Sequence, residues 1–155
     1  MKHIKTALLV LIAAIGFQQP ALAEQPMATI YMVTIHTANF PTMKAFFEDK
    51  MEMEIVMETG EFVEFSSRGI RLSLASYATL GSFLKSDSLT GERVGSAIGV
   101  GFKYVSTADV DAAYADLLAK GVVGVAPPKQ QVWGEYTAFF ADPDGNIHEL
   151  VAQTN

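Results

Sequence analysis

The stretch Asp109-Val-Asp-Ala-Ala-Tyr-Ala-Asp-Leu-Leu-Ala-Lys-Gly-Val122, followed further along by Asp142-Pro-Asp-Gly-Asn-Ile-His-Glu-Leu150, decides the fold of this chain. In the first part, Asp109 is suited to cap a helix and Gly121 to end it, which predicts a helix over 110–120. The second part begins with a turn, because proline presets φ and glycine accepts a positive φ. The alternation of residues after this turn predicts a strand.

The same order of elements occurs twice along the chain. The first half predicts a strand at 29–36, a helix capped by Asn39, and three short strands. The second half predicts a strand at 97–105, the helix after Asp109, and three more strands. The two groups of three strands are expected near 53–58, 61–66 and 70–75, and near 122–126, 135–141 and 146–152. At an offset of 70 residues, Asn39 falls on Asp109 and Lys50 falls on Lys120, which favours a tandem duplication.

These repeats predict an α+β fold of two tandem βαβββ modules, at about residues 29–75 and 97–153. The stretch 76–96 between them is too long and polar for a hairpin, so it is predicted to be a crossover. Apolar residues within it, from Tyr77 to Leu84, could form a short amphipathic helical turn. The crossover is either a plain surface linker or a flap over whatever the modules enclose.

The first 23 residues have the pattern of a secretory signal peptide. A short basic start at 1–5 precedes an apolar run at 7–17, and small residues at Ala21 and Ala23 suit signal peptidase cleavage. The apolar run is about half of the roughly 20 residues that a bilayer span needs, so no stable membrane anchor is expected after cleavage. We therefore expect a periplasmic or secreted protein with one domain at 24–155.

Composition excludes several classes of protein. The chain has 155 residues, of which 50% are hydrophobic and 18% charged, and it has no cysteine. These proportions exclude a disordered chain, a disulfide scaffold and thiolate chemistry. The formal net charge is −6, and binding nucleic acid needs clustered Lys and Arg, so no nucleic-acid partner is expected.

The two stretches quoted first, together with Trp133-Gly-Glu-Tyr136, resemble the vicinal oxygen chelate superfamily. That group includes glyoxalase I, extradiol dioxygenases, fosfomycin-resistance transferases and bleomycin-resistance binding proteins. The resemblance implies curved mixed sheets around a shared cleft. In metal-dependent members, four strand positions, two from each module, point His, Gln or Glu at a divalent ion, which polarises the substrate's oxygens.

This chain retains few of those metal ligands. The four positions carried over from the family are Met32, Ser73, Gly99 or Gly101, and Glu149. Of these residues, only Glu149 has a side chain of a type that binds the metal in the family. A single carboxylate does not hold a catalytic ion. No metal cofactor is therefore predicted, and a divalent metal remains the alternative.

Several polar residues are candidates for binding a ligand. His36 shares the strand face of Met32, so it is either a displaced metal ligand or general base, or a histidine at the cleft rim. His148 lies on the face opposite Glu149 and is expected to be structural. Because a buried charge must be paired, Glu149 is expected to pair with Arg71 or Lys103. The pair would be either a structural vestige without a binding role or a group that orients a polar ligand.

The remaining candidates concern the cleft wall. Trp133 and Tyr136, with Met32, could stack on a flat ligand or belong to the ordinary core. Gly99 and Gly101 remove side chains from the wall, which makes room for a ligand or marks a bulge. The predicted ligand-binding residues are thus His36, Arg71, Lys103, Trp133, Tyr136 and Glu149.

The main hypothesis is an exported, metal-independent protein that binds a small molecule between its modules or at a homodimer interface. The alternative is a metal-dependent lyase or dioxygenase that uses Glu149 and His36. A third possibility is an interaction module whose own side chains fill the cleft. The identity of the ligand does not follow from these residues.

Overall fold

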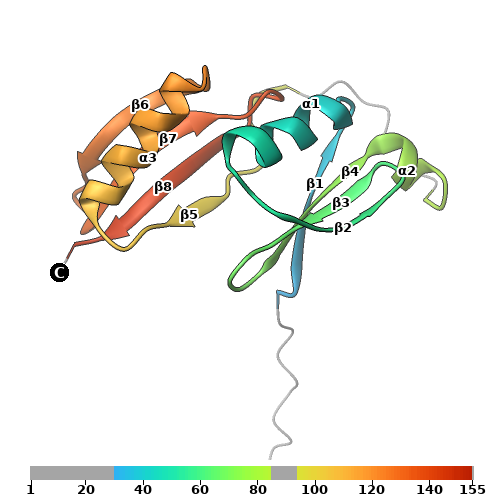
Figure 1. Ribbon diagram of the computed structural model, residues 1–155, viewed down its shortest axis with the longest axis horizontal. Coiled ribbons are helices and arrows are strands. Elements are labelled where there is room, and N and C mark those ends of the chain that lie inside the picture. Colours follow the sequence, from blue (N-terminus) through green and yellow to red (C-terminus); the bar gives the residue numbers. More distant parts are fainter. Residues whose placement is uncertain (1–29, 85–93, 155) are drawn as a thin grey trace, which may run out of the picture.

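The computed structural model describes residues 30–84 and 94–154. The predicted signal peptide and residues 85–93 of the crossover lie outside the described residues. Two four-stranded mixed sheets lie beside one another, each with its own helix (Figure 1). The predicted α+β fold of two tandem βαβββ modules is confirmed. None of the helices in the described ranges is long and apolar enough to cross a membrane.

The first module has the strand order β1-β4-β3-β2, and the second has the equivalent order β5-β8-β7-β6. In each sheet the first and last strands pair in parallel and the other pairs are antiparallel. The elements of the first module are β1 (Met32–Thr37), α1 (Phe40–Ala45), η1 (Phe46–Lys50), β2 (Ile55–Thr59), β3 (Phe62–Phe65) and β4 (Arg71–Ser76). The elements of the second are β5 (Gly101–Lys103), α3 (Thr107–Ala119), β6 (Val123–Gln130), β7 (Glu135–Ala141) and β8 (Ile147–Gln153). The short helix α2 (Tyr77–Gly81) follows β4 and forms part of the predicted crossover.

The helix caps differ in detail from the prediction. Helix α3 begins after Ser106, so Asp109 is wrong as its N-cap. Asp109 is instead the third helical residue of a capping box, in which its carboxylate accepts from the Ser106 amide at 3.1 Å and its own amide donates to Ser106 Oγ. Asn39 does hold the N-cap position of α1, but its side chain accepts from the hydroxyl of Thr42. Gly121 ends α3 with φ +81°, as its lack of a side chain allows.

Both sheets bury one face in a single core. Phe47 of η1 is fully buried, and its ring centroid lies 5.4 Å from that of Phe65 in β3 and 5.9 Å from that of His148 in β8. Phe46 next to it stacks on Phe140 of β7, at 6.3 Å between centroids. The helix of the first module therefore packs against the sheet of the second, and the two modules share their apolar core.

A buried polar cluster fixes the turn before β8. Asp142 accepts hydrogen bonds from the amide and side chain of Asn146, at 2.8 and 2.7 Å, and its Oδ2 lies 3.0 Å from Nε2 of His148. Burial raises the pKa of Asp142, but these hydrogen bonds outweigh it and the pKa is lowered overall. Nδ1 of His148 accepts from the Val100 amide, so Nε2 carries the proton that is donated to Asp142. The structural role expected for His148 is confirmed, because it joins the turn to the segment before β5.

Replacing Phe47 by alanine should destabilise the whole chain rather than one module. Its side chain fills space between both sheets, and removing a buried phenylalanine ring costs about 3–5 kcal/mol. Urea unfolding followed by circular dichroism should show one transition at a lower midpoint. Val132→Ala is the matched control, because Val132 is 99% exposed. Two separate transitions, or an unchanged midpoint, would contradict the shared core.

Candidate functional site

Each sheet has a second face, which we term the open face, opposite the face buried in the shared core. In the first sheet the register places Thr34 of β1 beside Ser73 of β4, which lies beside Glu64 of β3. In the second sheet Gly101 of β5 lies beside Glu149 of β8. The family-implied ligand positions thus fall on two open faces, and these point away from the core. One chain therefore carries two half-sites.

On the first open face, an ion pair occupies the middle of the sheet. The guanidinium of Arg71 donates to both carboxylate oxygens of Glu64, with Nε–Oε1 at 2.5 Å, and also to the hydroxyl of Tyr31. It lies 4.7 Å from the centre of the Tyr31 ring. The hydrogen bond from Arg71 lowers the pKa of Glu64, which is only 7% exposed. The predicted pair of Arg71 with Glu149 is wrong, because Glu64 is the neighbour that the register supplies.

Beside this pair, two hydroxyls meet at a family ligand position. Ser73 is fully buried, and its Oγ lies 2.7 Å from Oγ1 of Thr34. Neutral hydroxyls that satisfy one another are poor ligands for a divalent ion, which prefers carboxylate or imidazole donors. This part of the first open face therefore supplies no strong metal ligand.

A cavity of about 850 Å³ lies on the same open face, beneath α2 and the residues that follow it. Met32 and His36 of β1 line it from the sheet, and Leu80 and Phe83 line it from the crossover. Burial lowers the pKa of His36, and its ring has no hydrogen-bond partner in the described part of the chain. The cavity thus presents an imidazole whose protonation burial disfavours, within a wall of apolar and polar side chains, and α2 with the residues after it lines one side.

On the second open face, Glu149 is an isolated charge. A Cβ at Gly101 would lie 3.8 Å from Oε2 of Glu149, an ordinary van der Waals distance, so the carboxylate lies beside the glycine without requiring it. Burial, and secondly the charge of Glu135, raises the pKa of Glu149. No cation pairs with Glu149 in residues 30–84 or 94–154, because Lys103 instead donates to Gln153 Oε1 at 3.0 Å. The predicted pair of Glu149 with Lys103 is therefore wrong as well.

The predicted aromatic lining does not assemble. Tyr136 lies on the helix side of β7, where its hydroxyl donates to Asp111 of α3 at 2.8 Å. Side chains alternate between the two faces of β7, so Tyr136 shares the helix-side face with the buried Phe140. Trp133 is 59% exposed in the turn before β7, and its ring nitrogen donates to Glu135. Neither side chain lies in the cavity that Met32 and His36 line.

The donor set does not fit a metal ion held within one chain. Among the described residues, no group of three His, Cys, Asp or Glu side chains comes close enough to hold one. His36 and Glu149, the two ligands of the alternative hypothesis, lie on the open faces of different sheets. We therefore derive no catalytic step through a metal.

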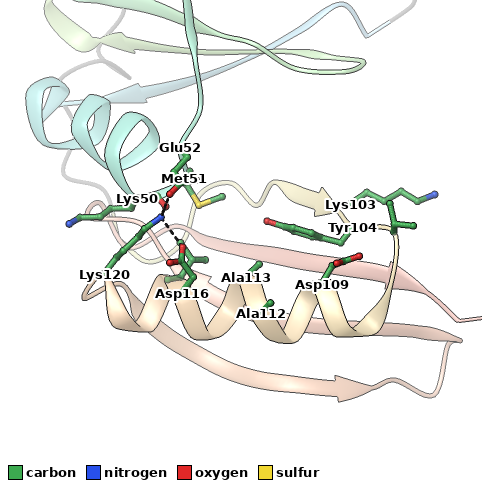
Figure 2. Close-up of a pocket in the computed structure, with 12 residues that line it drawn as sticks. Lys50, Met51, Glu52, Lys103, Tyr104, Asp109, Ala112, Ala113, Asp116 and Lys120 are labelled. Atoms are coloured by element: carbon green, nitrogen blue, oxygen red, sulfur yellow. Dashed lines mark hydrogen bonds and ion pairs between the residues drawn. The ribbon is translucent and has the colours of Figure 1, made fainter.

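A second cavity, of about 610 Å³, lies between η1 and α3 (Figure 2). Its polar groups largely neutralise one another: the ammonium of Lys120 lies between Glu52 at 2.5 Å and Asp116 at 2.8 Å, as Figure 2 shows. Lys120 also donates to the carbonyl oxygen of Lys50, at 3.3 Å. These contacts join the end of α3 to the first module, so the cavity marks a junction between the modules.

Comparisons with known proteins support this architecture. The family model described as Glyoxalase/Bleomycin resistance protein/Dioxygenase superfamily matches residues 29–150. A sequence search of the curated proteins finds no match.

Solved structures also resemble the chain. A glyoxalase/bleomycin resistance protein/dioxygenase from Nocardioides has 22% identity and a TM-score of 0.76, covering 85% of this chain and 87% of that one. A family enzyme from Burkholderia phytofirmans PsJN has 17% identity and a TM-score of 0.70, covering 82% and 100%. Lactoylglutathione lyase from Agrobacterium tumefaciens has 20% identity and a TM-score of 0.65, covering 83% and 96%. At these identities, the likeness concerns the fold alone.

Replacing Glu149 by glutamine should stabilise the protein at pH 7 and have little effect at pH 4. The pKa of Glu149 is raised in the folded chain, so ionisation above its usual value of 4.5 opposes folding. The neutral amide removes that penalty, and we expect a Tm increase on the order of 2 °C at pH 7. Thermal unfolding at the two pH values measures it, with the exposed Glu54→Gln as the control. A lower Tm at pH 7 would show that Glu149 has a stabilising partner.

Proposed function

The chain belongs to the glyoxalase/bleomycin resistance protein/dioxygenase superfamily, and on that premise we propose that it is an exported, metal-independent protein that binds a small molecule. The observation that carries this proposal is the donor set at the four family positions. Met32, Ser73 and Gly101 stand at three of them, and only Glu149 could hold an ion. A site of this kind binds its ligand through shape, apolar contact and a few polar groups.

The cavity on the first open face is the proposed binding site. Apolar side chains make up much of its wall, and its polar groups include the ring of His36, the carboxylate of Glu61 and the hydroxyl of Thr34. At about 850 Å³ it has room for a drug-sized molecule. Met32, Phe83 and Leu84 are 39%, 69% and 46% exposed around it. An apolar surface of this kind favours contact with a ligand or another chain.

We further propose that the protein acts as a homodimer. The cavity and Glu149 lie on open faces that both point away from the shared core. A single ligand can therefore contact both half-sites only when the second sheet of one copy covers the first sheet of another. The partner copy would then supply Glu149 to the site that contains His36.

Export rests on the sequence of the first 23 residues, whose basic start, apolar run and small cleavage residues suit a signal peptidase. The mature chain would begin at Glu24. The net negative charge of the whole chain makes nucleic acid an unsuitable partner.

Native mass spectrometry of protein recovered from the export compartment, purified without chelator, tests these proposals together. We expect two copies of a chain that starts at Glu24, with no stoichiometric metal. A small molecule retained in the wild-type dimer should be lost in a variant with Phe83→Ser and His36→Ala, because both side chains line the cavity. Lys129→Gln is the matched control, because Lys129 is exposed on β6 and lies outside that cavity.

Two outcomes contradict the proposal. A stoichiometric Zn, Ni, Mn or Fe ion that is lost in Glu149→Ala would instead support the metal-dependent lyase or dioxygenase. A monomer that still carries residues 1–23 would contradict both the dimer and export.

A further inference from the structure

A groove of about 610 Å³ lies between the two modules, separate from the cavity on the first open face. Arg68, in the loop between β3 and β4, and Arg71 line one side of it, and Lys103 of β5 lines the other. In Figure 1 this loop is the tip of the hairpin that extends toward β5. Of the described residues that line the groove, none is acidic. We term it the basic groove.

Four cations among the described residues form no ion pair, and two of these four, Arg68 and Lys103, line the groove. The sequence has 17 acidic and 11 basic residues, so most cations are expected to find an acidic partner. Lys44 and Lys120 do so, and Arg71 is neutralised by Glu64. In the part of the chain that the structure describes, Arg68 and Lys103 form no ion pair. Both also line an adjoining cavity of about 530 Å³, so two unneutralised cations lie at one opening.

The backbone of β5 adds hydrogen-bond donors on the same side. The carbonyl oxygen of Val100 accepts from β8, and the amide of Tyr104 donates to β8. In a parallel pair the backbone groups alternate in direction, so those of Gly101 and Lys103 point away from β8. Since β5 is the edge strand of its sheet, these amides pair with no strand among residues 30–84 and 94–154. They lie where an anion near Lys103 would accept hydrogen bonds.

The floor of the groove is apolar. Val33 of β1, Leu72 of β4 and Phe102 of β5 line it beneath the charged side chains. A bound molecule would therefore place an apolar body on the floor and an anionic head at Arg68 and Lys103. Two carboxylates lie close by without lining the groove: Glu64, which is bonded to Arg71, and Glu149, which lies beside Gly101.

We propose that the basic groove binds a small apolar molecule with a terminal carboxylate. The carboxylate accepts from the side chains of Arg68 and Lys103 and from the free amides of β5, and the apolar part covers the floor. This site does not require a metal, a second copy of the chain or the cavity around His36. The proposal for the basic groove can therefore be confirmed or refuted independently of the function proposed above.

Isothermal titration of the mature chain with decanoate and with decanol tests the proposal. The two probes share their apolar part and differ in the head group. We expect wild type to bind decanoate at least about tenfold more tightly than decanol, because charge-assisted hydrogen bonds are the stronger ones. The double variant Arg68→Gln with Lys103→Gln should lose about tenfold in affinity for decanoate and none for decanol. Both side chains are exposed, so the variant should keep the wild-type Tm.

Two control variants separate the groove from general effects. Lys129→Gln removes an exposed cation of β6 outside the groove and should leave both affinities unchanged. Phe83→Ser alters the cavity on the first open face and should also leave decanoate binding unchanged. Decanoate binding that is absent, that equals decanol binding, that survives the double variant or that is lost in Phe83→Ser would overturn the proposal.

Discussion

The packing of Phe47 between the two sheets is the constraint on which the rest of the structure depends. Because its ring contacts Phe65 in one module and His148 in the other, both sheets must direct the same kind of face inward. The polar faces that carry Ser73 and Glu149 are then left on the outside. A single chain folded in this way does not bring Ser73 and Glu149 together at one site.

On the first open face, the protein satisfies its own polar groups. Arg71 neutralises the buried Glu64, and Thr34 and Ser73 hydrogen-bond to each other. Burying such groups is tolerable because each has a partner. A divalent ion at this position would have to compete with an arginine that already holds the nearest carboxylate. The arrangement therefore favours a ligand that lies over the sheet rather than an ion set into it.

Periodicity was sufficient to predict the order of strands and helices, because each element repeats its apolar residues at its own spacing. The side-chain partners depended on strand register, which that spacing does not contain. Glu64 was missed because only the pairing of β3 with β4 brings it beside Arg71 and Ser73. Tyr136 was placed in the cleft because its motif suggested a site, whereas alternation along β7 directs it to Asp111 on the helix side. The face of a strand on which a residue lies is therefore predictable from the sequence. Its side-chain partners on neighbouring strands are much less predictable.

Lys103 and Glu149 are two charges of the second module that form no ion pair among the described residues. Lys103 and Glu149 lie on adjacent strands and could have neutralised each other, which would have lowered the electrostatic cost of burying Glu149. Lys103 instead hydrogen-bonds to the neutral Gln153, and Glu149 keeps a raised pKa beside Gly101. Both charges are thus without an ion pair in the described part of the chain, and alternation places both side chains on the open face of the second sheet. Since pairing within the chain would neutralise both charges, the absence of that pair is compatible with the binding roles proposed above for each residue.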